Sequence, residues 1–310
     1  MACFDPRVAV CRPGPPGAKQ SVTVVKGRYV DVSSSYIARG VKVVPIPCGQ
    51  CVGCRLERSR QWAIRLMKEL KLHDRSSFLT LTYSDEFLPR LPSGRPTLVL
   101  EDVQLFLKRL RFDFSPARLR FFQCGEYGDA TSRPHHHMIL FGEDFCKDRV
   151  PGRKSRSGFP QWTSPTLTRI WGKGDCFISD VSFESAAYVA RYCLKKQTGS
   201  GSKFFYQGRK PEFITMSRNP GIASAFFEEF RSDIYPHDEV IPGIGRPPSL
   251  PPKYFDKLLE KVDPVLFDSV KKKRVEGLDF FSDPESTDSR LATRARLKAS
   301  IIKNCLKRSL

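Results

Sequence analysis

The strongest indication of the fold comes from residues 119–141, Leu119-Arg-Phe-Phe-Gln-Cys-Gly-Glu-Tyr-Gly-Asp-Ala-Thr-Ser-Arg-Pro-His-His-His-Met-Ile-Leu-Phe141. Residues 119–127 and 136–141 are rich in apolar and aromatic side chains, and the Gly, Asp, Ser and Pro between them are typical of a turn. The stretch therefore predicts an antiparallel hairpin. Because side chains alternate between the faces of a strand, His135 and His137 share one face and His136 points to the other.

Glu126 lies on the first strand of this hairpin, and the predicted turn brings it beside the histidines. Two imidazoles and a carboxylate with open coordination positions suit a divalent cation that also accepts a phosphate oxygen, either Mn²⁺ or Mg²⁺. We therefore expect Glu126, His135 and His137 to be metal ligands. The alternative is a structural or surface histidine cluster beside a solvated glutamate.

Further elements extend outward from the hairpin. Residues 77–83 and 177–181 have the composition of strands, and apolar side chains at helical spacing predict helices at 55–72, 101–110 and 184–196. The fold class expected is α+β, with a central antiparallel β-sheet and flanking helices.

We expect three regions along the chain. Residues 1–74 form an N-terminal segment with a cysteine cluster and a basic helix. Residues 75–230 form the central domain. Residues 231–310 form a Pro-rich linker and a basic C-terminal tail.

The net charge is strongly positive, with 52 Lys and Arg against 33 Asp and Glu, giving +19. This balance favours a polyanionic partner, nucleic acid above all, although a solvated basic surface is the alternative. Residues 143–174 are expected to be an irregular insertion, whose basic residues are Arg149, Arg153, Lys154 and Arg156. We expect further DNA-contacting side chains at Arg55, Arg58, Arg60, Arg191 and Lys196.

No run approaches the ~20 apolar residues that cross a bilayer, and residues 1–12 lack a signal-peptide pattern. We therefore expect no membrane partner and a location in the cytosol.

Three cysteines occur close together in Cys48-Gly-Gln-Cys51-Val-Gly-Cys54. They can supply three thiolates to a structural zinc ion, with Cys3 or Cys11 as the fourth ligand. An iron–sulfur site and free thiols are the alternatives.

A third pattern is Tyr188-Val-Ala-Arg-Tyr192-Cys-Leu-Lys195. On a helix, positions i, i+4 and i+7 share one face, so both tyrosines and Lys195 line up. An aromatic pair alone is typical of core packing, but a lysine on the same face must reach water or an anion.

Taken in order, these motifs resemble those of HUH replication initiators: Phe78-Leu-Thr-Leu-Thr82, then Glu126 with His135-x-His137, then the tyrosine helix. The segments Cys124-Gly-Glu-Tyr-Gly128 and Arg133-Pro-His-His-His137 are similar, more narrowly, to replication-associated proteins of microviruses, which are small single-stranded DNA phages. Pro47-Cys-Gly-Gln-Cys-Val-Gly-Cys-Arg55 and Ser59-Arg-Gln-Trp-Ala-Ile-Arg65 resemble the gokushovirus branch. The likeness spans roughly residues 45–200. His136 departs from the family pattern, which usually has a bulky non-ionisable residue there.

The resemblance implies an HUH endonuclease domain at 75–230 and rolling-circle replication in the cytoplasm of a bacterial host. Tyr188 and Tyr192 would be the catalytic nucleophiles, assisted by Lys195, and a 5′-phosphotyrosine link would leave a 3′-hydroxyl primer before the displaced strand is rejoined. Partners would be viral origin DNA, single- and double-stranded, with host DNA polymerase and helicase. The alternatives are an HUH transposase or relaxase, and a non-catalytic zinc-dependent DNA-binding or packaging protein.

Overall fold

The computed structural model describes residues 3–12, 21–25, 36, 39, 41–128, 131–155, 158–191, 202–235, 237–276 and 283–308. Within it the chain forms two compact units. The smaller unit combines Met1–Arg58 with Lys271–Leu310, and the larger is Ser59–Val270. The domain boundaries expected at residues 74 and 230 stay predictions.

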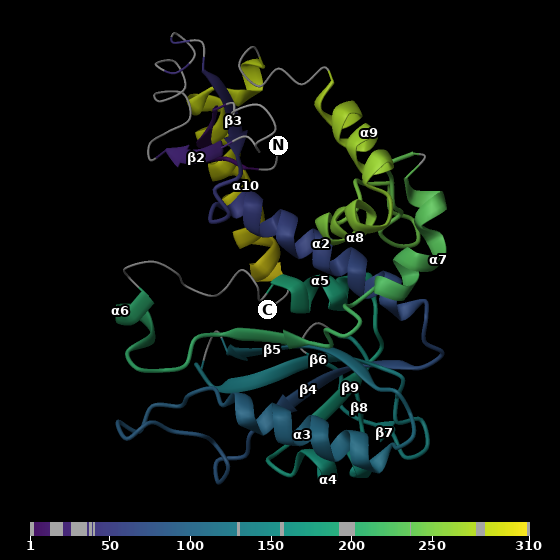
Figure 1. Ribbon diagram of the computed structural model, residues 1–310. Coiled ribbons are helices and arrows are strands. Elements are labelled where there is room, and N and C mark those ends of the chain that lie inside the picture. The colour runs from purple at the N-terminus through teal and green to yellow at the C-terminus, as the bar shows by residue number, and fades with distance from the viewer. Residues whose placement is uncertain are drawn as a thin grey trace. The chain divides into compact units, whose positions relative to one another are not determined.

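The larger unit contains an antiparallel sheet of seven strands in the order β10-β5-β6-β4-β9-β8-β7 (Figure 1). This confirms the predicted central antiparallel sheet and its hairpin, which is β5–β6. The strands are β4 (Ser76–Thr82), β5 (Arg120–Tyr127), β6 (Pro134–Phe141), β7 (Val150–Pro151), β8 (Trp162–Thr163), β9 (Cys176–Ser179) and β10 (Phe213–Met216).

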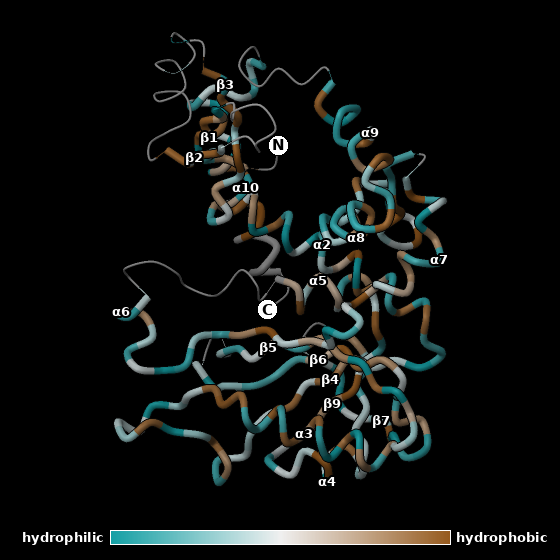
Figure 2. The backbone as a smooth tube through the Cα atoms, in the orientation of Figure 1, coloured by the Kyte–Doolittle hydropathy of each residue, from teal (hydrophilic) through white to brown (hydrophobic). Residues whose placement is uncertain are grey.

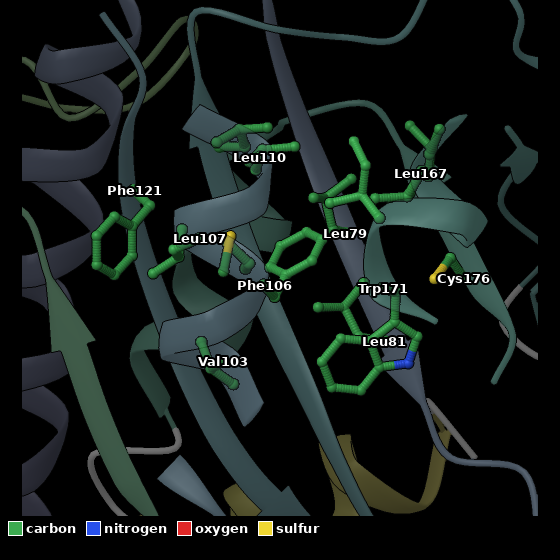
Figure 3. Packing of buried hydrophobic residues seen from close by; sticks show 14 of the residues in the cluster. Leu79, Leu81, Val103, Phe106, Leu107, Leu110, Phe121, Leu167, Trp171 and Cys176 are labelled. Atoms are coloured by element: carbon green, nitrogen blue, oxygen red, sulfur yellow. The ribbon is translucent and has the colours of Figure 1, made fainter. Parts of the chain in front are cut away.

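Helices α3 (Leu100–Asp113) and α4 (Pro165–Trp171) cover one face of this sheet. The buried side chains of α3 recur at helical spacing, and in Figure 3 Phe106 lies beside Leu79 and Leu107 lies toward Phe121. Both helices carry hydrophilic as well as hydrophobic residues along their length in Figure 2, as expected of helices with one buried face. The buried stripe of α3 consists of Val103, Phe106, Leu107 and Leu110.

The prediction that residues 143–174 form an irregular insertion is wrong in part, because α4 and the short strands β7 and β8 lie within this segment. Ser164 caps α4 by accepting a hydrogen bond from the Leu167 amide, and Gly172 ends the helix at φ 64°. The fully buried Trp171 anchors α4 in the core. Tertiary burial therefore orders a segment whose sequence is too short to show a clear period.

The other face of the sheet is partly covered by a second apolar cluster. Ala186 and Val189 of α5 (Phe183–Arg191) pack in it against Phe78 and Phe122 of the strands. Residues 192–196 of the predicted helix lie outside the described residues. The remaining helices of this unit are α6 (Ser202–Tyr206), α7 (Ser224–Ile234) and α8 (Lys253–Val262), with most of α2 (Val52–Leu70) and the start of α9 (Pro264–Val275).

The smaller unit has a three-stranded antiparallel sheet in the order β2-β1-β3. Its apolar cluster has only Val8 and Val10 fully buried among the described residues. The elements are β1 (Arg7–Arg12), β2 (Ser21–Val25), β3 (Lys42–Ile46), the 3₁₀ helix η2 (Pro284–Ser286) and α10 (Asp288–Arg308). No helix in the described parts of the chain is long and apolar enough to cross a membrane.

Candidate metal centre and its tyrosine

The β5–β6 hairpin places Glu126 directly opposite His135. Glu126 Oε1 lies 2.8 Å from His135 Nε2 and 3.1 Å from His137 Nε2. The ligand atoms of all three side chains lie within 4.8 Å of one another, and Glu126 is only 2% exposed. The structure therefore brings together the three residues predicted to hold a metal ion.

The second nitrogen of each histidine ring has its own partner. His135 Nδ1 donates to the Arg133 carbonyl over 3.1 Å, and His137 Nδ1 lies 3.0 Å from the hydroxyl of Thr80 on β4. Such outer contacts fix the orientation of metal-ligating histidines. Both Nε2 atoms point at the glutamate as a result, so the residues present fit a divalent cation.

The charge of Glu126 suits the same role. Burial disfavours the ionised carboxyl, but the hydrogen bonds from His135 and His137 outweigh burial and hold the pKa of Glu126 well below its usual range. At neutral pH the side chain is therefore an anionic carboxylate that can serve as an oxygen ligand for a metal ion.

Tyr188 lies beside this centre. Its ring centroid is 5.3 Å from that of His137 and 6.4 Å from that of Phe78. Burial of Ala186 and Val189 fixes the rotation of α5, while Tyr188 itself stays 37% exposed. A partly exposed phenol is thus held against one of the candidate ligands.

Other predicted residues cannot be placed as fully. Tyr192, Lys195 and Lys196 lie outside the described residues, as does the side chain of Arg191 at the end of α5. Their roles stay predictions.

The third histidine belongs to the opposite face of the sheet, as strand alternation predicts. His136 Nε2 donates to the Tyr83 hydroxyl over 3.0 Å, and Tyr83 donates to Asp102 Oδ2 over 2.9 Å. Lys173 Nζ lies 3.0 Å from the other carboxylate oxygen. Complete burial lowers the pKa of His136 to about 3, so the ring is neutral. Sequence reasoning missed this network, and its one signal was the unusual histidine.

The cysteine cluster also forms, and it includes Cys3. The thiols of Cys3, Cys48, Cys51 and Cys54 lie within 4.8 Å of one another. In the described part of the chain Cys11 is a buried residue of β1 outside this cluster. Burial raises the pKa of Cys51, but backbone amides, led by that of Phe4, outweigh burial and lower it to about 7.

The predicted DNA-contacting arginines of α2 all have protein partners. Arg58 Nη2 lies 3.5 Å from the Gly49 carbonyl, and Arg60 donates to Ser249 Oγ over 2.9 Å. Arg55 also has an interaction within the protein. The structure leaves their role in DNA binding a prediction.

The sheet carries two histidines and a glutamate on adjacent strands, with a tyrosine phenol against one histidine. This arrangement defines a protein with a candidate divalent-metal centre beside a tyrosine hydroxyl. The family model for the replication-associated protein ORF2 matches residues 76–197, which contain all of these groups. The chain is 36% identical over 257 residues to the replication-associated protein ORF2 of Spiroplasma virus 4, covering 80% of this chain and 77% of that protein. The chain therefore belongs to this family of replication-associated proteins.

Two further relatives match over shorter lengths. Replication-associated protein VP4 of Bdellovibrio phage phiMH2K is 36% identical, with 53% of this chain and 52% of that protein covered. Replication-associated protein ORF4 of Chlamydia phage 1 is 32% identical, with 49% of this chain and 38% of that protein covered. No solved structure matches the chain.

Proposed function

We propose that this protein initiates rolling-circle replication of a single-stranded DNA phage by nicking the origin as an HUH endonuclease. The observation that carries the proposal is the packing of the Tyr188 ring against His137, whose Nε2 is aimed at Glu126 together with that of His135. Family membership supports a role in phage DNA replication.

Glu126, His135 and His137 would hold a Mn²⁺ or Mg²⁺ ion. When bound, this ion would supply Lewis-acid stabilisation for the charge that develops on a non-bridging phosphate oxygen. Thr80 and the Arg133 carbonyl keep the histidine rings oriented for this role.

The nucleophile is the tyrosine. A free tyrosine side chain has a pKa of about 10, so a phenol must lose its proton as its oxygen attacks phosphorus. The new oxygen–phosphorus bond replaces the bond to the 3′ oxygen, which takes up a proton and leaves as the 3′-hydroxyl primer. Tyr192 would repeat the attack after one round of synthesis, and the released 3′-hydroxyl would then rejoin the displaced strand. Lys195 would stabilise the phenolate or the phosphate.

The partners implied are single- and double-stranded viral origin DNA in the cytoplasm of the bacterial host. The helicase would be a host protein, because the sequence has no phosphate-binding Gly-Lys-Ser/Thr loop of the kind that binds ATP. A host DNA polymerase would extend the 3′-hydroxyl.

The four clustered cysteines would hold a structural Zn²⁺ ion. Four thiolates are a standard closed zinc site, and the smaller unit has a very small apolar cluster of its own to stabilise it. We expect one zinc per purified chain, retained in Cys11→Ser and lost in Cys3→Ser. Equal zinc in both variants would exclude Cys3 as a ligand, and a visible iron–sulfur absorption band would exclude zinc.

The nuclease proposal is tested with labelled single-stranded oligonucleotides tiled across the phage genome, Mn²⁺ and a denaturing gel. We expect a slowly migrating covalent adduct that EDTA and Glu126→Gln abolish. Glu101→Gln, an exposed change on α3, should leave the adduct intact. An adduct that persists in both EDTA and Glu126→Gln would refute a metal-dependent mechanism.

A further inference from the structure

The basic insertion that sequence analysis singled out extends the central sheet beyond β9. Strands β7 and β8 lie beyond β9 at this edge of the sheet (Figure 1) and pair antiparallel with each other. Trp162 of β8 pairs with Ile178 of β9. Arg153 lies two residues after the end of β7, and its guanidinium carbon lies 5.0 Å from the centroid of the Phe177 ring on β9.

The strand register places this pair on the metal side of the sheet. Residues directly opposite one another on neighbouring strands have side chains on the same face. Thr80 is opposite His137 on one side and opposite Phe177 on the other. Ile178, the next residue of β9, packs on the α3–α4 face instead. Phe177 is therefore two strand spacings, or about 10 Å, from His137 along one row.

Among the described residues, neither the core packing of the sheet nor an ion pair accounts for Phe177 and Arg153. Phe177 is partly exposed and belongs to neither apolar cluster that covers the sheet among the described residues. Arg153 is exposed, and no carboxylate of a described residue lies within ion-pair distance of it. Arg149, by contrast, lies 4.0 Å from Asp180. An arginine stacked on an aromatic ring keeps its N–H groups available for a phosphate.

We propose that Arg153, supported by the ring of Phe177, binds a backbone phosphate of the single-stranded DNA next to the scissile one. This inference rests on the proposed function, because it takes the Glu126–His135–His137 centre as the place of cleavage. The DNA strand would run from this centre across β4 and β9, along the row that contains Thr80.

The test is fluorescence anisotropy with a labelled single-stranded oligonucleotide, with no Mn²⁺ or Mg²⁺ added so that no cleavage occurs. Arg153→Ala should weaken binding and reduce the slope of log K against log [salt] by about 0.7, the value for one phosphate contact on a single strand. The ratio of wild-type affinity to Arg153→Ala affinity should therefore fall by about 2.6-fold between 50 and 200 mM salt. The loss should be equal on an origin sequence and a scrambled one, because phosphate contacts do not read bases.

Arg111→Ala is the matched control. Arg111 also lies over a phenylalanine ring, at 5.7 Å from Phe121, but on the opposite face of the same sheet. Its binding and salt slope should equal those of wild type. Phe177→Leu keeps an apolar side chain and the arginine charge, so it should weaken binding without changing the slope.

A salt slope for Arg153→Ala equal to that of Arg111→Ala would overturn the proposal. If wild type still forms the metal-dependent adduct in that case, only the Arg153 contact is wrong. If the slope falls as expected and wild type forms no adduct, the DNA contact stands and the nickase proposal fails.

Discussion

Thr80→Val tests whether the hydrogen bond to His137 Nδ1 prepares this ring for a metal ion. The substitution removes the hydroxyl that lies 3.0 Å from the ring nitrogen and keeps a β-branched side chain that suits β4. Loss of an outer partner of a metal-ligating histidine typically costs about 10- to 100-fold in metal affinity. Thr80 is only half-buried, so water can replace part of the contact. We therefore expect the lower end, about tenfold or ~1.4 kcal/mol.

Thr82→Val is the matched control. Thr82 is on the same strand and face, opposite His135, but its hydroxyl donates to the Asp175 carbonyl over 2.9 Å. Calorimetric titration with Mn²⁺ measures the affinity of each variant, and the rate of adduct formation is followed against Mn²⁺ concentration. Thr80→Val should need about tenfold more Mn²⁺ and recover its rate when saturated. The reasoning is refuted if both variants bind Mn²⁺ equally, or if excess Mn²⁺ fails to restore the rate.

Three further predictions concern stability in urea denaturation. Glu69→Gln should lower the free energy of unfolding by about 3 kcal/mol, because it breaks a buried charged network. Burial raises the pKa of Glu69, but hydrogen bonds, first among them that from His73, lower this pKa overall. The wild type should therefore keep this stabilisation at pH values above the unfolded-state pKa of ~4.3 and lose it as pH falls through the lower folded-state pKa. A stability difference between wild type and Glu69→Gln that persists in strong acid would contradict a role for the ionised carboxylate. Gly174→Ala should cost roughly 3 kcal/mol or more, because its φ is 152° and a Cβ would lie 2.5 Å from a backbone nitrogen, whereas Gly94→Ala, with open space around it, should cost about 1 kcal/mol. Leu140→Ala should lower the free energy of unfolding by about 2–5 kcal/mol, because Leu140 is fully buried and its removal leaves a cavity. A decrease under about 1 kcal/mol would show that the surrounding side chains fill the cavity.

The hairpin and its metal face could be predicted because both depend on local sequence. Turn residues between two apolar runs set the strand pairing, and alternation then decides which histidines share a face with Glu126. The structure confirms the antiparallel sheet and brings the three side chains together.

Long-range contacts could not be predicted in the same way. The hydrogen bonds of Tyr83 with Asp102 and His136 require α3 to pack on the sheet, which no local pattern specifies. The choice between Cys3 and Cys11 as a fourth thiol also depends on how β1 is placed. Strands as short as β7 and β8 are too brief to show a period of two, so the basic insertion was expected to be irregular.

In the proposed mechanism, a tyrosine of this chain becomes linked to the 5′ end of a cleaved DNA strand. The most direct measurement is mass spectrometry of peptides from the purified protein–DNA adduct, with Tyr188→Phe, Tyr192→Phe and the double variant compared on the same substrate. We expect a 5′-phosphate on Tyr188 or Tyr192, with the adduct lost in the double variant and the single variants ranking the two tyrosines. No adduct from folded, DNA-binding protein across the tiled sequences, or an adduct that survives the double substitution, would contradict this claim.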